Sequence, residues 1–235
     1  HTVSHIGLVG GGQNPRPGEI SLSHRGVLFL DELSEFSRLT LEVLRQPLED
    51  GFVTISRARG TIIFPSNFIM VAATNPCPCG FYGFSGKHQC NCTAGQIARY
   101  KKRISGPLLD RIDLYVEVPS VEVEKLTDDK NISENSESVR ARVQKARDLQ
   151  KKRMGGDGLV CNADMKNKHL KKYCQLNGEA LSILKNAVTV FGLSARSYQK
   201  IIKIGRTIAD LSDSVEIKPE HIAEALQYRQ KSDEY

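Results

Sequence analysis

The sequence predicts an α/β domain built on a parallel sheet, followed by an all-helical domain. Three observations lead to this prediction. Through residues 1–119, apolar runs that fit buried strands alternate with helical patterns and are separated by glycine and proline. Residues 136–230 carry apolar side chains at helical spacing almost throughout. The polar segment between them, TDDKNISENSES at 127–138, is typical of an exposed linker.

In the first domain, three apolar runs read as strands of one sheet: Val27–Leu30, Phe68–Ala73 and Leu114–Val118. Helical patterns lie between them at Thr40–Glu49 and Thr93–Arg103. Because strands that alternate with helices favour parallel pairing, we expect a helix-covered parallel sheet.

A β-hairpin is expected at 52–65. The segments GFVTIS and GTIIFP are rich in β-branched residues and meet at the short connection Arg57-Ala58-Arg59-Gly60. Two arginines therefore stand at the predicted tip.

The helical domain begins with a basic helix, in which Val139, Val143, Ala146 and Leu149 share a helical spacing. Three or four further helices follow, with breaks at Asn177-Gly178 and Gly192 and a last helix that starts at Pro219. The predicted divisions are therefore an α/β core at 1–126, a linker with the basic helix at 127–160, and a helical domain at 161–235.

The composition is that of a globular protein. The chain has 235 residues, 40% of them apolar and 26% charged, and a formal charge of +6, which permits an anionic partner without requiring one. No apolar run reaches the roughly 18–20 residues that cross a bilayer, and the N-terminus lacks a signal-peptide layout. We therefore expect a cytoplasmic protein with no membrane partner, whose six cysteines bind metal or stay reduced.

Two adjacent carboxylates, Asp31 and Glu32, end the first strand in GVLFLDELSEF. Ligands of open parallel sheets bind at the carboxyl ends of the strands. There, Asp31 could hold Mg²⁺ and Glu32 could orient or deprotonate a water, as nucleotide hydrolysis requires. The alternative is an acidic N-terminus of the next helix, which the helix dipole also favours.

Polar groups near the next two strands fit the same chemistry. The run FIMVAATNP ends in Thr74-Asn75, and the Asn75 amide could hold the attacking water or a γ-phosphate oxygen. Arg111 precedes the third apolar run and could neutralise charge during phosphoryl transfer, even from a neighbouring subunit. The alternative for Arg111 is a local ion pair with Asp110 or Asp113.

Four separated motifs resemble one family. GGGQNPRPGEISLSHRGVLFLDELSEF, VAATNPCPCG, SGPLLDRIDLYVEVP and GLSARSYQKIIKIGRTIADL are together similar to the magnesium-chelatase-like AAA+ ATPases, in the bacterial ComM/YifB group. The resemblance implies a partial AAA+ core followed by a helical lid, with ATP and Mg²⁺ as cofactors. It further implies that Asp31 and Glu32 are the Walker B pair, Asn75 is sensor 1, Arg111 is the arginine finger and Arg196 is the sensor 2 arginine.

A P-loop of the form G-x-x-x-x-G-K-[ST] is absent from the sequence, since the one Gly-Lys pair, Gly86-Lys87, is followed by His88. In the family the P-loop lies upstream of the segment with which this chain begins. We therefore expect a C-terminal fragment of a longer ATPase, inactive alone and unable to bind ATP tightly.

Four cysteines form C-x-C, ten residues, C-x-C: Cys77, Cys79, Cys90 and Cys92. Four thiolates suit a structural tetrahedral Zn²⁺ site, and the glycine-rich loop between the pairs can turn back to close it. His88 could replace one cysteine, and four reduced surface thiols are the alternative. Cys161 and Cys174 stand apart and are expected to be ordinary thiols.

Three functions remain open. The resemblance implies an ATP-driven motor, a homo-oligomeric and hexameric ring, that remodels DNA by branch migration or helicase activity. In related ATPases a hairpin before sensor 1 projects into the ring pore, so Arg57 and Arg59 would contact DNA, supported by the basic runs at 99–103 and 140–153. The alternatives are a magnesium-chelatase-type subunit and a zinc-stabilised binding module without ATPase activity.

Overall fold

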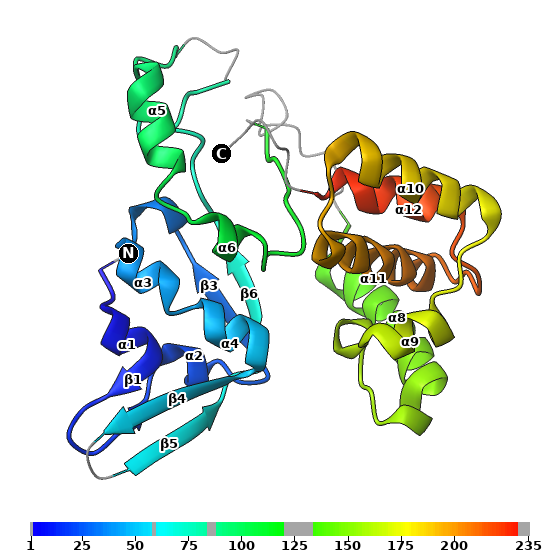
Figure 1. Ribbon diagram of the computed structural model, residues 1–235, viewed down its shortest axis with the longest axis horizontal. Helices are drawn as coiled ribbons and strands as arrows, with labels where there is room; N and C mark the ends of the chain where they lie inside the picture. Colours follow the sequence, from blue (N-terminus) through cyan, green and yellow to red (C-terminus); the bar gives the residue numbers. More distant parts are fainter. Residues whose placement is uncertain (1, 58–59, 84–87, 120–133, 230–235) are drawn as a thin grey trace. The chain divides into compact units, whose positions relative to one another are not determined.

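A computed structural model describes residues 2–57, 60–83, 88–119 and 134–229, which fall into two compact units divided between Ile112 and Asp113 (Figure 1). The first unit is mixed α/β and contains a parallel sheet, and the second is helical. The predicted fold class, a partial AAA+ core followed by a helical region, is thereby confirmed. None of the described helices is both long and apolar enough to cross a membrane.

Among its described residues, the first unit consists of short helices and three small two-stranded sheets. In chain order its elements are α1 (His5–Val9), β1 (Gly10–Gly11), β2 (Arg16–Pro17), α2 (Glu19–Leu22), β3 (Val27–Leu30), η1 (Leu33–Glu35), α3 (Arg38–Glu42), α4 (Arg45–Asp50), β4 (Phe52–Arg57), β5 (Gly60–Pro65), β6 (Ile69–Ala72), α5 (Ala94–Lys101) and α6 (Gly106–Leu109).

The parallel sheet pairs β3 with β6, with Val27 opposite Ile69 and Leu30 opposite Ala72. Leu28 and Leu30 are buried, whereas Val27 and Phe29 point to the exposed face, where Phe29 is 60% exposed. The sequence predicted strands buried on both faces. In the described part of the chain, only one face of this sheet is covered.

The helix predicted over Thr40–Glu49 is two helices, α3 and α4, that meet at Val43 and Leu44. Pro47 explains the break. Proline has no backbone N–H to donate to the carbonyl four residues earlier, which is that of Val43, and its ring clashes with that carbonyl. The helix predicted at Thr93–Arg103 is present as α5, and Thr93 caps it in a capping box with Gln96.

The hairpin is confirmed. β4 and β5 pair antiparallel from Phe52 opposite Pro65 to Arg57 opposite Gly60. Figure 1 shows the hairpin at one end of the unit, on the side away from the end toward which β6 points.

The strand predicted at Leu114–Val118 is wrong. The segment is not part of any strand that the structure describes, and Val118 is 86% exposed. The Tyr115 N–H donates instead to the Tyr228 carbonyl at the end of α12 (Pro219–Gln227), within the helical unit. An apolar run forms a strand only where another strand accepts its hydrogen bonds.

The helical unit contains α8 (Ser136–Met154), η2 (Gly155–Asp157), η3 (Asn162–Asp164), α9 (Asn167–Tyr173), α10 (Gly178–Phe191), α11 (Ala195–Leu211) and α12. The predicted breaks are confirmed: Asn177 caps α10, Gly192 ends it with φ 60°, and Pro219 opens α12. Of the predicted linker 127–138, residues 127–133 lie outside the described residues, and the last three begin α8 behind the N-cap Asn135.

The core of this unit encloses apolar side chains of α9 to α12 together with Met154 of α8. The basic helix packs inward only through the C-terminal part of the face that its pattern predicted. Ala146, Gln150 and Met154 are buried, whereas Val139 and Val143 are exposed. The reason lies in a buried polar network that anchors the end of α8.

This network centres on Asp210 of α11. Its carboxylate accepts hydrogen bonds from Arg153 at 2.6 and 2.7 Å, from Asn162 at 2.8 Å and from Arg206 at 3.1 Å. The Arg206 guanidinium also donates to the carbonyls of Ser214 and Val215. The network therefore joins α8, η3 and α11 through charge-assisted hydrogen bonds.

Candidate active site and metal centre

The acidic pair lies at the carboxyl end of β3. Asp31 directly follows Leu30, and its carboxylate accepts a hydrogen bond from the Glu32 N–H at 2.9 Å. Both side chains are exposed. They are therefore open to a ligand at the edge of the sheet where open parallel sheets bind their ligands.

Glu32 has a left-handed backbone, with φ 52° and ψ 48°. Such a conformation is uncommon for a residue with a side chain and costs on the order of 1–3 kcal/mol. It turns the chain from β3 into η1, where the Glu32 carbonyl accepts from the Glu35 N–H at 2.8 Å. Strained backbone of this kind clusters at functional sites.

The end of β6 lies beside the acidic pair. The Ala73 N–H donates to the Leu30 carbonyl, and the Leu33 N–H donates to the Ala73 carbonyl, so the pairing continues past both strands. Thr74 follows, and its hydroxyl lies 2.6 Å from that of Ser34. Asn75 is the next residue and is exposed. The structure thus brings three predicted residues, Asp31, Glu32 and Asn75, to the same edge.

Arg111 lies in the turn after α6 and is held by three groups. Its guanidinium donates to the carbonyls of Arg45 at 3.1 Å and Pro107 at 2.6 Å, and pairs with Glu49 at 2.6 Å. The side chain is 18% exposed. The alternative reading expected a local ion pair with Asp110 or Asp113, but the carboxylate partner that the structure places on this guanidinium is Glu49 of α4.

Arg196 belongs to the helical unit. It stands in the first turn of α11, whose N-cap Ser194 accepts a hydrogen bond from the Ser197 N–H. Its side chain is partly buried.

Arg57, one of the two hairpin arginines, ends β4 and is exposed. Its guanidinium donates to the Ser56 carbonyl at 3.2 Å. Arg59 lies outside the described residues.

The four cysteines form one cluster. Their sulfur atoms all lie within 4.8 Å of one another, and Cys77 is 3.3 Å from Cys79 and 3.7 Å from Cys90. Four thiolates around a tetrahedral Zn²⁺, with Zn–S bonds of about 2.3 Å, stand about 3.8 Å apart. The cluster could therefore hold a metal ion with little rearrangement.

The thiols of the cluster differ in acidity. Hydrogen bonding from the Phe81 backbone lowers the pKa of Cys79 to about 6, although removal from water opposes this. A thiolate is the form that binds metal. Cys174 is buried in the helical unit, and burial raises its pKa to about 11, as fits an ordinary structural thiol.

His88 is not part of the cluster; its ring packs on Phe81 with the centroids 5.4 Å apart. The neighbouring Gly86-Lys87 pair lies outside the described residues.

The sequence reading missed three residues that shape the acidic edge. Ser34 and Tyr100 are buried against it, and Arg103 reaches it with its side chain. Tyr100 and Arg103 stand in the run RYKKR, whose pattern predicts only a positively charged surface. The sequence did contain one indication that part of this run is buried: Tyr100 is a large aromatic residue on the side of α5 that faces inward.

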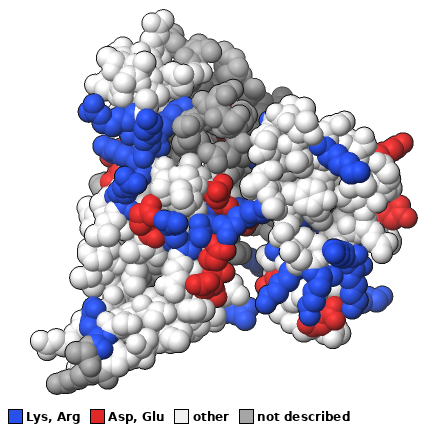
Figure 2. Space-filling view, viewed as in Figure 1, with Lys and Arg blue, Asp and Glu red and all other residues white. Residues whose placement is uncertain are grey.

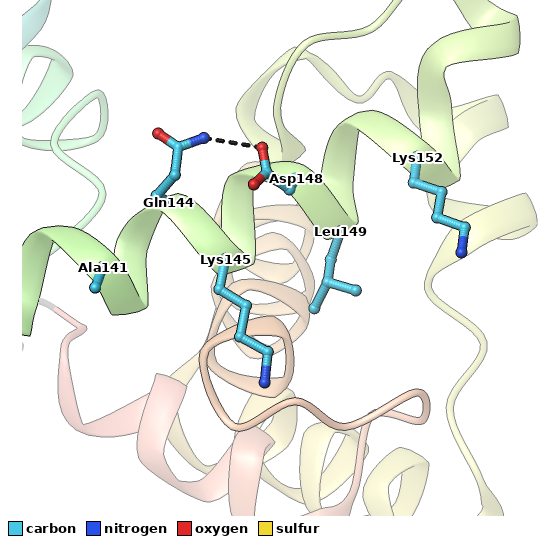
Figure 3. A pocket seen from close by; sticks show the side chains of 6 residues that line it. All are labelled: Ala141, Gln144, Lys145, Asp148, Leu149 and Lys152. Atoms are coloured by element: carbon cyan, nitrogen blue, oxygen red, sulfur yellow. Dashed lines mark hydrogen bonds between the residues drawn. The ribbon is translucent and has the colours of Figure 1, made fainter.

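A hollow of about 420 Å³ lies along α8, and we do not interpret it as a binding site. Figure 3 shows that its six lining side chains all come from this one helix, and Gln144 donates to Asp148 across it at 2.8 Å. Ala141 and Leu149 add only small apolar surfaces. Within the described part of the chain, no second element contributes a lining side chain.

Comparison with known proteins follows the two units. The family described as magnesium chelatase, subunit ChlI, matches residues 1–126, and the C-terminal part of that subunit matches residues 133–229.

The chain is 47% identical over 229 residues to competence protein ComM of Haemophilus influenzae. It is 43% identical to the uncharacterized protein YifB of Escherichia coli and 42% identical to that of Salmonella typhimurium. Each match covers 97% of this chain but 44% of the relative, so the chain spans less than half the length of these proteins. The chain belongs to the magnesium chelatase subunit ChlI family, in its ComM/YifB group.

Proposed function

We propose that the chain is the part of a ring-forming AAA+ ATPase that activates the attacking water and couples hydrolysis to DNA remodelling. The observation that carries this proposal is the carboxyl edge of β3 and β6, where Asp31 and Glu32 stand beside Asn75. The residues fit ATP chemistry because carboxylate oxygens are the ligands that Mg²⁺ prefers.

Each residue has one role in this proposal. Asp31 holds Mg²⁺, Glu32 orients or deprotonates the water, and Asn75 contacts the water or the γ-phosphate. ATP would supply the phosphoanhydride bond, and Mg²⁺ would neutralise the negative charge of its phosphates. Arg196 contacts phosphate as the sensor 2 arginine, from the helical unit.

Arg111 is the proposed arginine finger, acting on the site of a neighbouring subunit in a hexameric homo-oligomer. The structure gives its guanidinium three partners, which use three of the five N–H groups that an arginine offers. A guanidinium fixed in this way is preorganised to present the remaining donors to a transferring phosphoryl group.

The cysteine cluster is proposed as a structural Zn²⁺ site with Cys77, Cys79, Cys90 and Cys92 as its ligands. Four protein ligands leave no open position, so the metal stabilises the loop and performs no chemistry. Reduced cysteines of this kind fit the cytoplasm, where we place the protein.

DNA is the proposed substrate because basic side chains gather in two places on the surface, where they could contact phosphates. Figure 2 shows them over α5 and, separately, in the part of the helical unit that holds α8 and α9. The hairpin adds Arg57, on the side of the unit away from the carboxyl ends of the sheet (Figure 1). A magnesium-chelatase-type subunit remains the second candidate, because the family description itself favours it. A zinc-stabilised module without ATPase activity is the third.

DNA affinity across a salt series, measured on the full-length protein, separates these candidates. Removing both hairpin arginines (Arg57→Ala/Arg59→Ala) should weaken binding and reduce the salt slope by roughly one unit per lost phosphate contact. ATP turnover should be unchanged, because the hairpin lies away from the acidic edge. A charge-matched control, Lys185→Ala/Lys218→Ala, removes two exposed positive charges from the helical unit outside α8 and α9.

Equal affinity and slope in the hairpin variant and the wild type would remove the local support for DNA. The chelatase-type reading would then be preferred. A collapse of turnover would instead place the hairpin in a subunit contact.

A further inference from the structure

The chain contains a long stretch without any carboxylate side chain. No aspartate or glutamate occurs at residues 51–109, although the 235 residues include 27 of them, a frequency that would place about seven there. The same stretch contains seven lysine and arginine residues. It includes the hairpin, the cysteine loop and α5. A basic segment of this kind favours an anionic partner.

The end of α5 concentrates positive charge on its outward side. Arg99, Lys101 and Lys102 stand in or directly after its last turn, and Arg99 and Lys102 are exposed. Because successive residues of a helix are about 100° apart, these side chains leave α5 on the sides away from Tyr100, which is buried. Among the described residues, no carboxylate pairs with Arg99 or Lys102.

Two exposed aromatic residues precede α5, and one of them contacts its basic end. Phe81 and Tyr82 belong to the loop between the two cysteine pairs, and they are 38% and 48% exposed. The Lys101 ammonium lies over the Tyr82 ring, 5.3 Å from its centroid, so Tyr82 reaches the last turn of α5. Exposed aromatic rings beside lysine and arginine are the combination with which proteins bind single-stranded nucleic acid.

The cysteine cluster anchors this loop at the start of α5. Its sulfur atoms come from both ends of the loop and lie within 4.8 Å of one another. Cys79 stands two residues before Phe81, and Cys92 directly precedes Thr93, the N-cap of α5. Lys101 lies about 12 Å further along the helix axis, so the negative charge of thiolates is at the opposite end of α5 from the basic residues.

We propose that the loop–α5 surface binds single-stranded DNA. This surface consists of two aromatic and three basic residues: Phe81, Tyr82, Arg99, Lys101 and Lys102. The rings stack on unpaired bases, and the basic side chains contact the phosphates between them. The choice of DNA rests on the proposed function, whereas the preference for a single strand rests on the exposed rings, because the bases of a duplex are already stacked on one another.

The loop–α5 surface is separate from the other basic groups of the first unit. Arg103 is not part of it, because its guanidinium pairs with Glu35 at 2.7 Å. Figure 1 shows α5 at the opposite end of the unit from the hairpin strands β4 and β5. Variants can therefore remove the two sets of contacts one at a time.

Fluorescence anisotropy of a labelled oligothymidylate, which forms no duplex, measures binding to the full-length protein without nucleotide. Tyr82→Leu keeps an apolar side chain but removes the ring, and it should weaken binding about ten-fold, within the range for one base–aromatic stack. The slope of log affinity against log salt should not change, since stacking releases no phosphate counterions. Tyr82→Phe, which keeps the ring, should bind as the wild type does.

Replacing both lysines should give a different signature. Lys101→Gln/Lys102→Gln should weaken binding and also reduce the salt slope, by about 0.7 for each lost phosphate contact with a single strand. Phe191→Leu is the matched aromatic control and should leave affinity unchanged. Phe191 is 41% exposed and lies 3.7 Å from Arg229, but it stands in the helical unit.

A duplex of mixed sequence provides the second arm of the test. Tyr82→Leu should change affinity for the duplex less than about two-fold, because paired bases are not open to a ring. Equal weakening for single strand and duplex would overturn the stacking contact. Unchanged affinity for the oligothymidylate, or an equal loss in Phe191→Leu, would overturn the site. Phe81→Leu, measured in the same way, keeps the test decisive if Tyr82→Leu folds poorly.

ATP turnover of the full-length protein separates this inference from the proposed function, since the binding assay contains no nucleotide. If Glu32→Gln abolishes turnover while Tyr82→Leu and the double lysine variant bind the single strand like the wild type, the site is refuted and the ATPase stands. If the wild type hydrolyses no ATP but Tyr82→Leu loses the single strand, the proposed function fails and the binding site stands.

Discussion

Replacing Asp210 by asparagine should strongly destabilise the helical unit. The Asp210 side chain is 1% exposed and stands between the guanidinium groups of Arg153 and Arg206, the latter 3% exposed. Asparagine keeps the shape but removes the only negative charge that the structure places on both arginines, among the residues it describes. A positive charge is then left buried without compensation.

Removing one partner of a buried ion pair costs about 3–5 kcal/mol. The pKa shifts of the arginines agree with this position, because the hydrogen bond to Asp210 raises the pKa of Arg153, and burial lowers that of Arg206. The unit spans residues 113–232. For a domain near this size, about 4 °C of Tm per kcal/mol gives a fall of about 12–20 °C.

Thermal and urea unfolding of the chain, followed by circular dichroism, measure this cost. Asp213→Asn is the control, since Asp213 pairs with Lys145 on the surface and should cost no more than about 1 kcal/mol. A loss below about 1 kcal/mol for Asp210→Asn would refute the reasoning. It would show that water or another group compensates the charges of the two arginines.

Two further predictions concern the metal and the arginine finger. Elemental analysis of the purified chain should find about one zinc per chain, since a structural site needs four ligands, and Cys90→Ser should lower that content; a well-folded, metal-free wild type would favour four reduced thiols. In the full-length protein, Arg111→Ala should abolish turnover, and mixing it with Glu32→Gln subunits should restore activity by placing an intact arginine beside an intact site. No recovery in mixed rings would argue against action between subunits.

The sequence could predict those parts of the site that depend on local pattern. Asp31 and Glu32 were found because a strand must end where its apolar run stops, and parallel strands bring their carboxyl ends together. The hairpin and the helix breaks at Gly192 and Pro219 follow from local backbone preferences in the same way.

What the sequence could not predict depends on tertiary partners. The ion pair between Arg111 and Glu49 joins segments far apart in the chain, and so does the hydrogen bond from Arg103 to the Ser34 carbonyl. The basic run RYKKR does not indicate which distant groups its side chains contact. The Leu114–Val118 segment failed for the same reason. Its apolar pattern fits a strand, but hydrogen-bond partners decide whether a strand forms.

Single-turnover hydrolysis of ATP by the full-length protein, with Mg²⁺ present, tests the central claim that the Asp31–Glu32 edge hydrolyses nucleotide. Glu32→Gln should still retain ATP but hydrolyse it about 10²–10⁴-fold more slowly, because the amide cannot accept a proton from water. Glu19→Gln, an exposed carboxylate on α2, should hydrolyse at the wild-type rate. Equal hydrolysis by Glu32→Gln and wild type would contradict the claim.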